Sequence, residues 1–394
     1  MEQRELVIVG AGPAGMTAAI YGRRAGLDVL LLERGLAGGQ VNLTEEIENW
    51  PGMPRISGAD LGNTFRGHAL SLDAEIRAAE VEKIERRGEA KVVVTDKEEI
   101  GAEAVILATG AAFHPLGCAG EEEHVGRGVS YCAVCDGPLY ADEEIAVVGG
   151  GNSAVEEAVS LTNFASKVYL IHRRDEFRAG RAAVDRALSN SKIVPVRNSV
   201  VEKIDGEETV EKIFIKNVKT GEGSSLPVTG VFIFVGQTPN DSVFRGLVKA
   251  TEEGWVLTDE NMETSVEGIF AAGDVRHKRL RQIVTAASDG AAAALGAAAY
   301  VNEQLHLRSV LLEPESVTAF FYSGADAAQA RLSDEAEKIA KEKNKYFPII
   351  DGYKNARMTG KLGVALPSVA ELHRGAVVKA APIASAADIV RALD

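Results

Sequence analysis

One local pattern, an apolar strand followed by a glycine-rich turn, a helix and a second strand, occurs twice in this chain of 394 residues. In the first copy the strand Leu6–Val9 runs into the turn, the helix covers 14–25, and the second strand, 29–32, ends at Glu33. The turn consists of Gly10, Ala11, Gly12, Pro13, Ala14 and Gly15. Such glycines let the backbone approach a pyrophosphate at a helix N-terminus, and a carboxylate at Glu33 can bind ribose hydroxyls. The stretch therefore predicts a dinucleotide site, with a tight turn lacking any ligand as the alternative.

The second copy has the strand 145–148, a helix to about Leu161 and the strand 168–171. Its turn consists of Gly149, Gly150, Gly151, Asn152, Ser153 and Ala154. Where the first copy has an acid, this copy has a basic group made of His172, Arg173, Arg174 and Arg178. Clustered guanidiniums bind a 2′-phosphate that a carboxylate would repel, so the second site is predicted to prefer NADPH to NADH. A solvated basic helix start is the alternative.

The second copy lies inside the first fold. A buried strand at 104–108, ending in Thr109 and Gly110, is expected to return to the first domain before the insertion. After a crossing at 236–240, the apolar strand 269–272 ends in Gly273 and Asp274, and an alanine-rich helix covers 285–300. Asp274 suits a ribityl or phosphate-linked hydroxyl, although a simple helix cap explains it equally well.

Two of the three cysteines, Cys132 and Cys135, are separated by two residues and followed by Asp136. This spacing closes a reversible disulfide easily, and the acid can handle the proton that thiol chemistry needs. Half of a zinc site has the same spacing, but no second cysteine pair or histidine cluster follows. We therefore predict a redox disulfide and no metal site, with zinc or chance as alternatives. The remaining Cys118 is expected to be a buried, inert thiol.

Charge and hydropathy exclude several classes of protein. The 43 basic and 57 acidic residues give a net charge of −14, which argues against nucleic acid or an anionic membrane as the main partner. No apolar run is expected to reach the length of a membrane span, and the first residues lack the features of a signal peptide. A cytoplasmic location is the expectation, and a lone cysteine pair in that reducing compartment indicates catalysis.

With these motifs in order, the chain closely resembles the low-molecular-weight, NADPH-dependent thioredoxin reductases from about residue 4 to 308. The residues that carry the resemblance are 10–15, Glu33, 38–40, 49–52, 108–110, 132–136, 149–154, 172–178, 273–274 and 281–282.

The resemblance implies an α/β protein with two Rossmann-like domains, the NADPH-binding one (115–241) inserted in the FAD-binding one (1–114 and 242–308), and a homodimer. It implies FAD contacts at Gly10, Ala11, Gly12, Pro13, Ala14, Gly15, Glu33, Gly39, Gln40, Asn49, Val81 (by its backbone), Thr109, Gly110, Gly273, Asp274, Arg281, Gln282 and Ile283. It implies NADPH contacts at Gly149, Gly151, Asn152, Ser153, Ala154, His172, Arg173, Arg174 and Arg178.

The resemblance also implies a mechanism, in which hydride passes from NADPH to the flavin and electrons then pass to the disulfide and to an external disulfide. Cys135 is expected to face the flavin and form the charge-transfer thiolate, and Cys132 is expected to attack the substrate. Asp136, with a raised pKa, is expected to exchange protons with the thiols. Rotation of the NADPH domain is expected about hinges at 112–118 and 236–242. Pro138 and Leu139 replace aromatic residues that relatives often carry, so a thioredoxin-like protein stands beside thioredoxin as the expected partner.

Two other classes share some of these features. A flavin-dependent dithiol oxidase would pass electrons to oxygen, but it needs no nicotinamide pocket. A redox-sensing scaffold would use its C-terminal region to dock a client.

The region 309–394 continues past the usual end of the family. Its expected order, strand 317–322, helix 327–343, strand 347–350, a hairpin at 373–375 and helix 385–393, resembles thioredoxin, with Pro367 at the position of the cis-proline. Pro367 as an ordinary strand-edge proline is the alternative. Residues 324–329 contain no cysteine pair, and no cysteine follows Cys135. We therefore expect a thioredoxin-like domain that cannot exchange thiols, and docking of a partner is the favoured role over dimer contacts or an inert relic.

Overall fold

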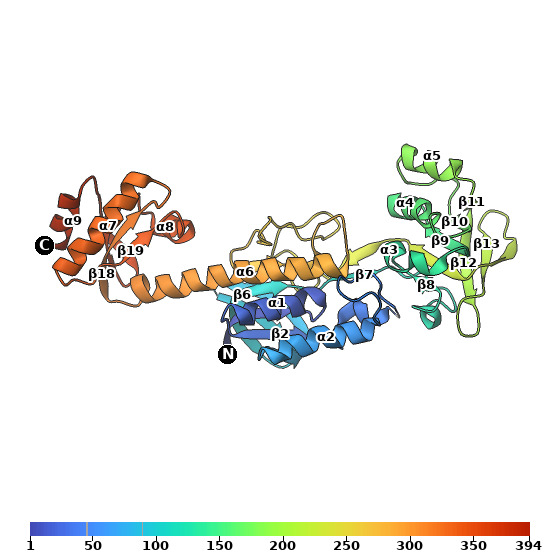
Figure 1. Ribbon diagram of the computed structural model, residues 1–394, viewed down its shortest axis with the longest axis horizontal. Helices are drawn as coiled ribbons and strands as arrows, with labels where there is room; N and C mark the ends of the chain where they lie inside the picture. Colours follow the sequence, from blue (N-terminus) through green and yellow to red (C-terminus); the bar gives the residue numbers. More distant parts are fainter. Residues whose placement is uncertain (45, 89) are drawn as a thin grey trace. The chain divides into compact units, whose positions relative to one another are not determined.

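The computed structural model describes residues 1–44, 46–88 and 90–394 (Figure 1). The chain forms two compact units, Met1–Ala298 and Ala299–Asp394. Each unit has its own sheets and its own buried apolar clusters.

The first sheet of the larger unit has seven strands in the order β3-β2-β1-β6-β5-β4, with β17 paired to β6. Strands β1, β2, β3, β6 and β17 are parallel neighbours, whereas β4, β5 and β6 are antiparallel. The bounds are β1 (Glu2–Val9), β2 (Val29–Glu33), β3 (Glu75–Ala78), β4 (Val81–Arg87), β5 (Ala90–Thr95), β6 (Glu99–Leu107) and β17 (Ile269–Ala271). Residues 6–9 and 29–32 are fully buried, as all-apolar runs in parallel strands should be. The expected return of 104–108 to this sheet is confirmed, because β6 pairs with β1.

Helices cover this sheet, and some of them begin at the turns that follow its strands (Figure 1). They are α1 (Pro13–Arg24), α2 (Gly58–Ser71) and α6 (Ile283–Leu307), with short 3-10 helices η1 (Gly39–Leu43) and η4 (Gly273–Val275). Helix α6 packs closely on α1, because a Cβ atom on Gly290 would lie 2.1 Å from the carbonyl oxygen of Ala14. The alanine-rich composition thus permits the close helix contact expected from the sequence.

The inserted part is built on a second, fully parallel sheet in the order β11-β10-β9-β15-β8. Its strands are β8 (Val129–Ser130), β9 (Glu144–Gly149), β10 (Lys167–His172), β11 (Ile193–Arg197) and β15 (Gly230–Phe234). Its helices are α3 (Ala133–Asp136), α4 (Asn152–Leu161) and α5 (Arg181–Ser189), with 3-10 helices η2 (Glu122–His124) and η3 (Gly137–Tyr140). An antiparallel sheet of β12 (Ser199–Asp205), β13 (Lys212–Asn217) and β14 (Gly223–Pro227) packs beside it.

A two-stranded antiparallel ribbon joins the two halves of this unit. It consists of β7 (Ala111–Phe113), on the way out, and β16 (Gln237–Pro239), on the way back. The two crossings are also tied by Asn240, whose side-chain amide donates to the carbonyl of Thr109 at 2.8 Å and whose backbone N–H donates to the carbonyl of Gly110 at 3.0 Å. The predicted insertion of one nucleotide fold into the other is therefore present.

The helical segment Ile283–Leu312 is long and apolar enough to cross a membrane by length and composition, contrary to the expectation that no run reaches this length. Of its most apolar window, 44% is buried inside the protein. Gly290 faces α1, and the buried Asp289 pairs with Arg276 and Lys278 at 2.8 and 3.0 Å. The high hydropathy of this segment is due to the many alanines of α6, which packs on α1.

The smaller unit contains the end of α6, the π-helical turn η5 (Arg308–Leu312) and a four-stranded sheet in the order β19-β18-β20-β21. Its elements are β18 (Ser316–Tyr322), α7 (Ala327–Glu342), β19 (Ile349–Asp351), α8 (Ala356–Leu362), β20 (Ser368–His373), β21 (Ala376–Pro382) and α9 (Ala386–Leu393). Strands β18 and β19 are parallel, and the other pairs are antiparallel. The hairpin at 373–375 is as predicted, whereas α8 was not foreseen. The Leu366–Pro367 peptide bond is cis.

Candidate functional site

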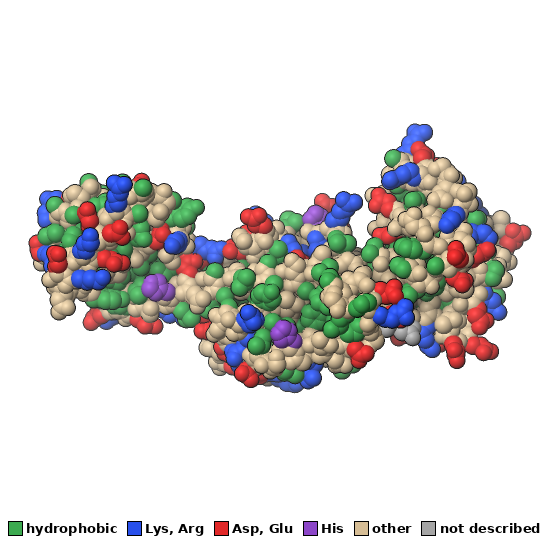
Figure 2. Space-filling model, in the orientation of Figure 1, with side chains coloured by type: hydrophobic (Ala, Val, Ile, Leu, Met, Phe, Trp, Pro, Cys, Tyr) green, Lys and Arg blue, Asp and Glu red, His purple; other side chains and the backbone are tan. Residues whose placement is uncertain are grey.

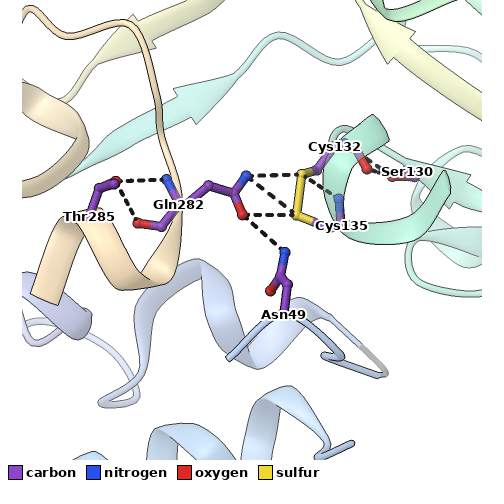
Figure 3. Close-up of a disulfide and its surroundings, with 6 residues drawn as sticks. All are labelled: Asn49, Ser130, Cys132, Cys135, Gln282 and Thr285. Atoms are coloured by element: carbon purple, nitrogen blue, oxygen red, sulfur yellow. Dashed lines mark hydrogen bonds between the residues drawn. A yellow bond between two sulfur atoms is a disulfide. The ribbon is translucent and has the colours of Figure 1, made fainter. Parts of the chain in front are cut away.

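Cys132 and Cys135 form a disulfide at the first turn of α3 (Figure 3). Cys132 immediately precedes the helix, and its Sγ accepts a hydrogen bond from the backbone N–H of Cys135 at 3.2 Å. Ser130 fixes the approach to this turn, since its hydroxyl accepts from the Cys132 N–H at 3.0 Å. Both cysteines are half-buried. The sulfurs therefore sit on a short, hydrogen-bonded turn that holds them at one edge of the inserted fold.

One side chain from the other half of the unit, Gln282, reaches the disulfide, and Asn49 supports it (Figure 3). The Nε2 atom of Gln282 lies 3.6 Å from Cys132 Sγ and 3.9 Å from Cys135 Sγ. Asn49 donates to Gln282 Oε1 at 3.2 Å. The structure thus brings together Asn49, Gln282 and the cysteine pair, which are far apart in the sequence.

Burial raises the pKa of Asp136, the acid that follows the pair, against the opposing effect of a hydrogen bond from Ser130. The direction agrees with the expectation of an acid in a partly dry site. A carboxyl of this kind takes up and releases a proton closer to neutral pH than an exposed aspartate does.

A cavity of about 1040 Å³ opens beside the disulfide. It is lined by residues of both halves, among them Gln40, Asn49, Cys132, Cys135, Ser153, Arg178, Asp274, Arg281 and Gln282. This volume is at the upper end of the range for ligand sites. Groups from both nucleotide folds therefore border one open space.

The glycines of the first turn serve different purposes. A Cβ atom on Gly10 would lie 2.4 Å from the carbonyl oxygen of Ala108, and one on Gly15 would lie 1.8 Å from that of Gly10, so protein packing demands both glycines. Gly12 has φ −76° and ψ −176°, which any residue can adopt, and a Cβ there would meet nothing within 4 Å. Neither packing nor conformation requires glycine at this position, whereas close approach of a pyrophosphate does.

The second turn repeats this arrangement. A Cβ on Gly149 would lie 2.4 Å from the carbonyl oxygen of Phe234, and one on Gly150 would lie 2.2 Å from the ring of His172. Gly151 has φ −87° and ψ −179°, and the space before it is open. Asn152, Ser153 and Ala154 begin α4 directly after it. The residues present at both turns fit a dinucleotide.

Glu33 lies at the end of β2 beside the first turn. Its Oε2 accepts from the Ala11 N–H at 2.7 Å and its Oε1 from the Gly35 N–H at 2.8 Å. The Glu33 carbonyl accepts from the Ala79 N–H at 3.0 Å, which places the start of β4, and Val81, close to this end of the sheet. Pro13 and Ala14 begin α1 at the same turn.

Buried polar atoms without hydrogen-bond partners lie at the carboxyl ends of β6 and β17. Among the described residues, Thr109 Oγ1 and Asp274 Oδ1 have no hydrogen-bond partner. Burial raises the pKa of Asp274, and Lys278, which forms an ion pair with Asp274 at 3.4 Å, opposes this effect. Gly273 has a positive φ of 80° and donates to buried Asp289 at 3.1 Å. A ribityl hydroxyl fits the unpartnered Thr109 Oγ1, and Asp274 Oδ1, whose one charged neighbour is Lys278, can accept from another hydroxyl.

Three further predicted contacts, Gln40, Arg281 and Ile283, line the same cavity, and Gly39 precedes Gln40. Gln40 donates to the carbonyl of Ala111 at the start of β7, and Gly39 packs on Gly12. The Arg281 guanidinium stacks on Trp255 at 3.8 Å, and burial lowers its pKa against the opposing effect of Asp274. Ile283 is the first residue of α6.

The basic group after β10 is exposed except for His172. No ion pair involves Arg173, Arg174 or Arg178 within the part of the chain that the structure describes. His172 is buried and its Nε2 has no partner among the described residues. Burial lowers the pKa of His172, and the charges of the three arginines lower it further, against a backbone hydrogen bond at Glu176. The site thus offers unpaired positive charge next to a neutral ring.

Comparison with known proteins matches residues 4–290 to the pyridine nucleotide-disulphide oxidoreductases. The thioredoxin reductase of Bacillus subtilis is 47% identical over 300 residues, which cover 76% of this chain and 95% of that protein. The chain belongs to the thioredoxin reductase family of these oxidoreductases. The protein is therefore a flavoprotein oxidoreductase that reduces a disulfide, and its family binds FAD and NAD(P).

Solved reductase structures match the same part of the chain. The Streptococcus pyogenes reductase is 46% identical, covers 76% of this chain and 98% of its own, and superposes with a TM-score of 0.74. The Lactococcus lactis reductase in the FR conformation is 45% identical, covers 76% and 99%, and has a TM-score of 0.54. About a quarter of the present reductase thus has no counterpart in these relatives.

Several residues that support the reductase site were not predicted from the sequence. Lys278, Asp289 and Trp255 hold Asp274, Gly273 and Arg281 in place. Only the tertiary structure identifies these residues, because a single lysine or aspartate in a sequence does not indicate which residues it will contact.

Cys118 was expected to be a buried, inert thiol, and it is free and only half-buried in the structure. Burial, and then the charge of Glu121, raise its pKa to about 11, so the thiol stays protonated at neutral pH. The prediction of inertness is thus supported although the burial is partial.

Asp136→Asn should stabilise the reductase at pH 7 by on the order of 1 kcal/mol, because the folded state then holds no buried charge. The pKa of Asp136 is higher in the folded than in the unfolded protein, where it is near 3.8. The free energy of unfolding therefore falls as the pH rises above 3.8, and the full loss is reached above the pKa of the folded state. The gain should therefore vanish near pH 3. Thermal unfolding of both proteins between pH 3 and 8 measures this, with exposed Asp142→Asn as the control; equal stabilities at pH 7 would contradict the account.

Proposed function

We propose that this protein uses NADPH to reduce the disulfide of thioredoxin or of a thioredoxin-like protein. The observation that carries the proposal is the position of the Cys132–Cys135 disulfide, in contact with Gln282 and beside a cavity bordered by both nucleotide folds. When bound, NADPH supplies a hydride and FAD passes its two electrons to a disulfide. The chain's own residues then bind these groups, hold the sulfurs and move protons.

The first turn is proposed to hold FAD. The open space before Gly12 suits the pyrophosphate, and Glu33 suits a ribose. Thr109 Oγ1, which has no hydrogen-bond partner among the described residues, and the Asp274 carboxylate suit hydroxyl groups. Gln40, beside the cavity, is proposed to contact the flavin ring. The proposed FAD-binding segments are 1–114 and 242–308.

The second turn, within 115–241, is proposed to hold NADPH rather than NADH. A 2′-phosphate requires positive charge that is not already committed to an ion pair. The unpaired guanidiniums of Arg173, Arg174 and Arg178 supply this charge near the end of β10.

Cys135 is proposed to exchange electrons with the flavin and Cys132 to attack the substrate. Breaking the S–S bond with two electrons and one proton leaves one thiol and one thiolate. The Gln282 amide lies 3.6 Å from Cys132 Sγ and 3.9 Å from Cys135 Sγ, so a donor lies near both sulfurs, and the thiolate is proposed to form on the flavin-facing Cys135. Asp136, with its raised pKa, is proposed to move the proton between the thiols and the substrate.

The disulfide is proposed to alternate between the flavin and the external substrate by rotation of the inserted domain. Two solved relatives with 46% and 45% identity give TM-scores of 0.74 and 0.54 over the same share of the chain, a difference that domain arrangement explains better than divergence does. The ribbon of β7 and β16, within 112–118 and 236–242, is the proposed hinge.

The region 309–394 is proposed to be a thioredoxin-like domain. Its parallel β18–β19 pair, antiparallel β20–β21 hairpin and the cis bond before Pro367 support this assignment. Because it contains no cysteine, its proposed role is to dock a partner.

The protein is also proposed to be a homodimer. Helices α1, α2 and α6 lie on one face of the larger unit (Figure 1). Large apolar side chains on these helices are exposed, including Tyr21, Leu70 and Leu295. Figure 2 shows hydrophobic side chains gathered over this face. A second copy would cover such a surface.

Cys135→Ser should retain FAD and bleach the flavin on anaerobic addition of NADPH, yet lose disulfide reduction by at least about a hundredfold. Absorbance spectra and turnover with thioredoxin measure both properties. Cys118→Ser is the matched control and should keep full turnover. A Cys135→Ser protein that reduces thioredoxin at the wild-type rate would overturn the relay, and slow bleaching of the wild type would favour an oxidase.

Replacing Arg173 and Arg174 with glutamine should raise the KM for NADPH by about ten- to a hundredfold, because contacts to a charged phosphate are worth about 1.5–3 kcal/mol. The KM for NADH should change little. Steady-state kinetics with both nucleotides test this, with exposed Arg181→Gln as the control. An equal effect on the two nucleotides would remove the 2′-phosphate assignment.

A panel of thioredoxins, glutaredoxins and peroxiredoxins, tested with the full chain and with a chain ending at Arg308, should identify the partner. Loss of the second unit should raise the KM for that partner and leave NADPH-driven flavin reduction unchanged. Equal KM values for both chains across the panel would argue against docking.

The protein should sediment with about twice its chain mass of 41.8 kDa. Replacing both Leu70 and Leu295 with aspartate should shift it to the monomer, because buried charge is costly. Sedimentation velocity measures this, and a wild-type monomer at micromolar concentration would exclude the dimer.

A further inference from the structure

The ring of Tyr131, the residue directly before Cys132, stacks on the ring of Phe113 in β7. The ring centroids are 5.0 Å apart and the ring planes differ by 17°. Both side chains are half-buried and border the cavity beside the disulfide. The stack therefore connects the ribbon between the two halves to the turn that carries the reacting sulfurs.

Phe113 is held by the FAD half of the larger unit. Its strand, β7, pairs with β16, and the carbonyl of Ala111 in the same strand accepts a hydrogen bond from the side chain of Gln40. The backbone N–H of Asn240 also donates to the carbonyl of Gly110, just before this strand, at 3.0 Å. The position of the Phe113 ring is thus fixed from the side of the first sheet.

Tyr131 is held by the inserted fold, through a buried carboxylate. Glu121, which is 4% exposed, accepts from the Tyr131 hydroxyl at 2.8 Å and from the backbone N–H groups of Leu116 and Gly117 at 2.9 and 2.7 Å. Leu116 and Tyr131 also pack against the apolar core of the inserted fold. These residues therefore move with that fold, which leaves 114–115 as the joint on the outgoing crossing.

A turn of the inserted fold about this joint would move Tyr131 relative to Phe113. Aromatic rings attract one another while their centroids lie about 4.5–7 Å apart, so a displacement of a few ångströms ends the stacking. In the arrangement that has the stack, Gln282 Nε2 lies 3.6 Å from Cys132 Sγ. The stack and the approach of the disulfide to the FAD half therefore occur together.

We propose that the stack of Tyr131 on Phe113 stabilises the arrangement in which the disulfide faces the FAD half. It thereby sets the share of molecules in which the flavin and the disulfide can exchange electrons. Both are positioning residues, since they act through the place of the Cys132–Cys135 turn. The rotation itself rests on the proposed function. Loss of an aromatic pair of this kind should change the ratio of the two arrangements by about two- to tenfold.

The test measures the two arrangements by pulsed electron paramagnetic resonance on the full-length holoenzyme. Spin labels are attached at Glu82→Cys on β4 and Ser189→Cys at the end of α5, two exposed positions in different halves. The protein also carries Cys118→Ser and keeps its disulfide, so only the two new thiols react, and it is diluted with unlabelled protein. Phe113→Leu should lower the population of the stacked arrangement, relative to the other, by about two- to tenfold.

The partner ring provides the matched variants. Tyr131→Leu should have the same effect as Phe113→Leu, and the double variant should shift the populations no further, because both changes remove one contact. Tyr131→Phe keeps the ring without the hydroxyl, so its populations should match the wild type. Wild-type populations in both leucine variants, or additive effects in the double variant, would overturn the proposal.

Single-turnover kinetics separate this effect from general damage to the site. After anaerobic mixing with limiting NADPH, flavin absorbance should fall as hydride arrives and recover as electrons pass to the disulfide. Phe113→Leu should raise the ratio of the first rate to the second, whereas general damage would slow both steps and leave the ratio unchanged, which would count against the proposal. Failure of NADPH to bleach the wild-type flavin would instead overturn the proposed function, and the spin-label populations, measured without NADPH, would still decide the role of the stack.

Discussion

The structure of the larger unit depends on the contact between the disulfide and the start of α6. Electrons pass to a disulfide only from a group within a few ångströms, so the cysteines on the inserted fold must reach the other fold's cavity. The chain achieves this by leaving the first sheet after Gly110 and returning at Asn240, with both crossings tied by β7, β16 and the hydrogen bonds of Asn240. This narrow ribbon holds the two folds together and is the proposed hinge between them.

The same turn is used at both nucleotide sites, and the end of the following strand makes them differ. The open space before Gly12 and before Gly151 is equivalent, so a pyrophosphate at either proposed site would meet a similar backbone. Glu33 engages both carboxylate oxygens with backbone N–H groups, which hold it as an acceptor for hydroxyls. The arginines after β10 have no such partners and remain available for a phosphate. The proposed difference in nucleotide preference therefore rests on a few residues, whereas the fold beneath them is common to both sites.

The sequence predicted most of the fold because the buried parallel strands are continuous apolar runs and the turns are marked by glycine. It also predicted the cysteine pair, since two-residue spacing leaves few alternatives. The roles of Lys278, Asp289 and Trp255 could not be predicted, because their partners lie across the fold. Helix α8 was missed, since residues 356–362 contain three separate polar residues and a glycine and show no clear apolar period. The contact of Gln282 with the sulfurs had no sequence signal at all, because 147 residues separate it from Cys135.

The second unit limits where electrons can go. The whole chain holds three cysteines, and none follows Cys135, so this unit contains no group able to accept electrons from Cys132 by thiol exchange. Cys118 does not offer a route either, since its thiol stays protonated at neutral pH. Electrons that reach Cys132 must therefore leave for a separate molecule. Any contribution of residues 309–394 to this transfer has to act through binding, which affects how often a substrate disulfide meets Cys132 rather than the chemistry of the exchange.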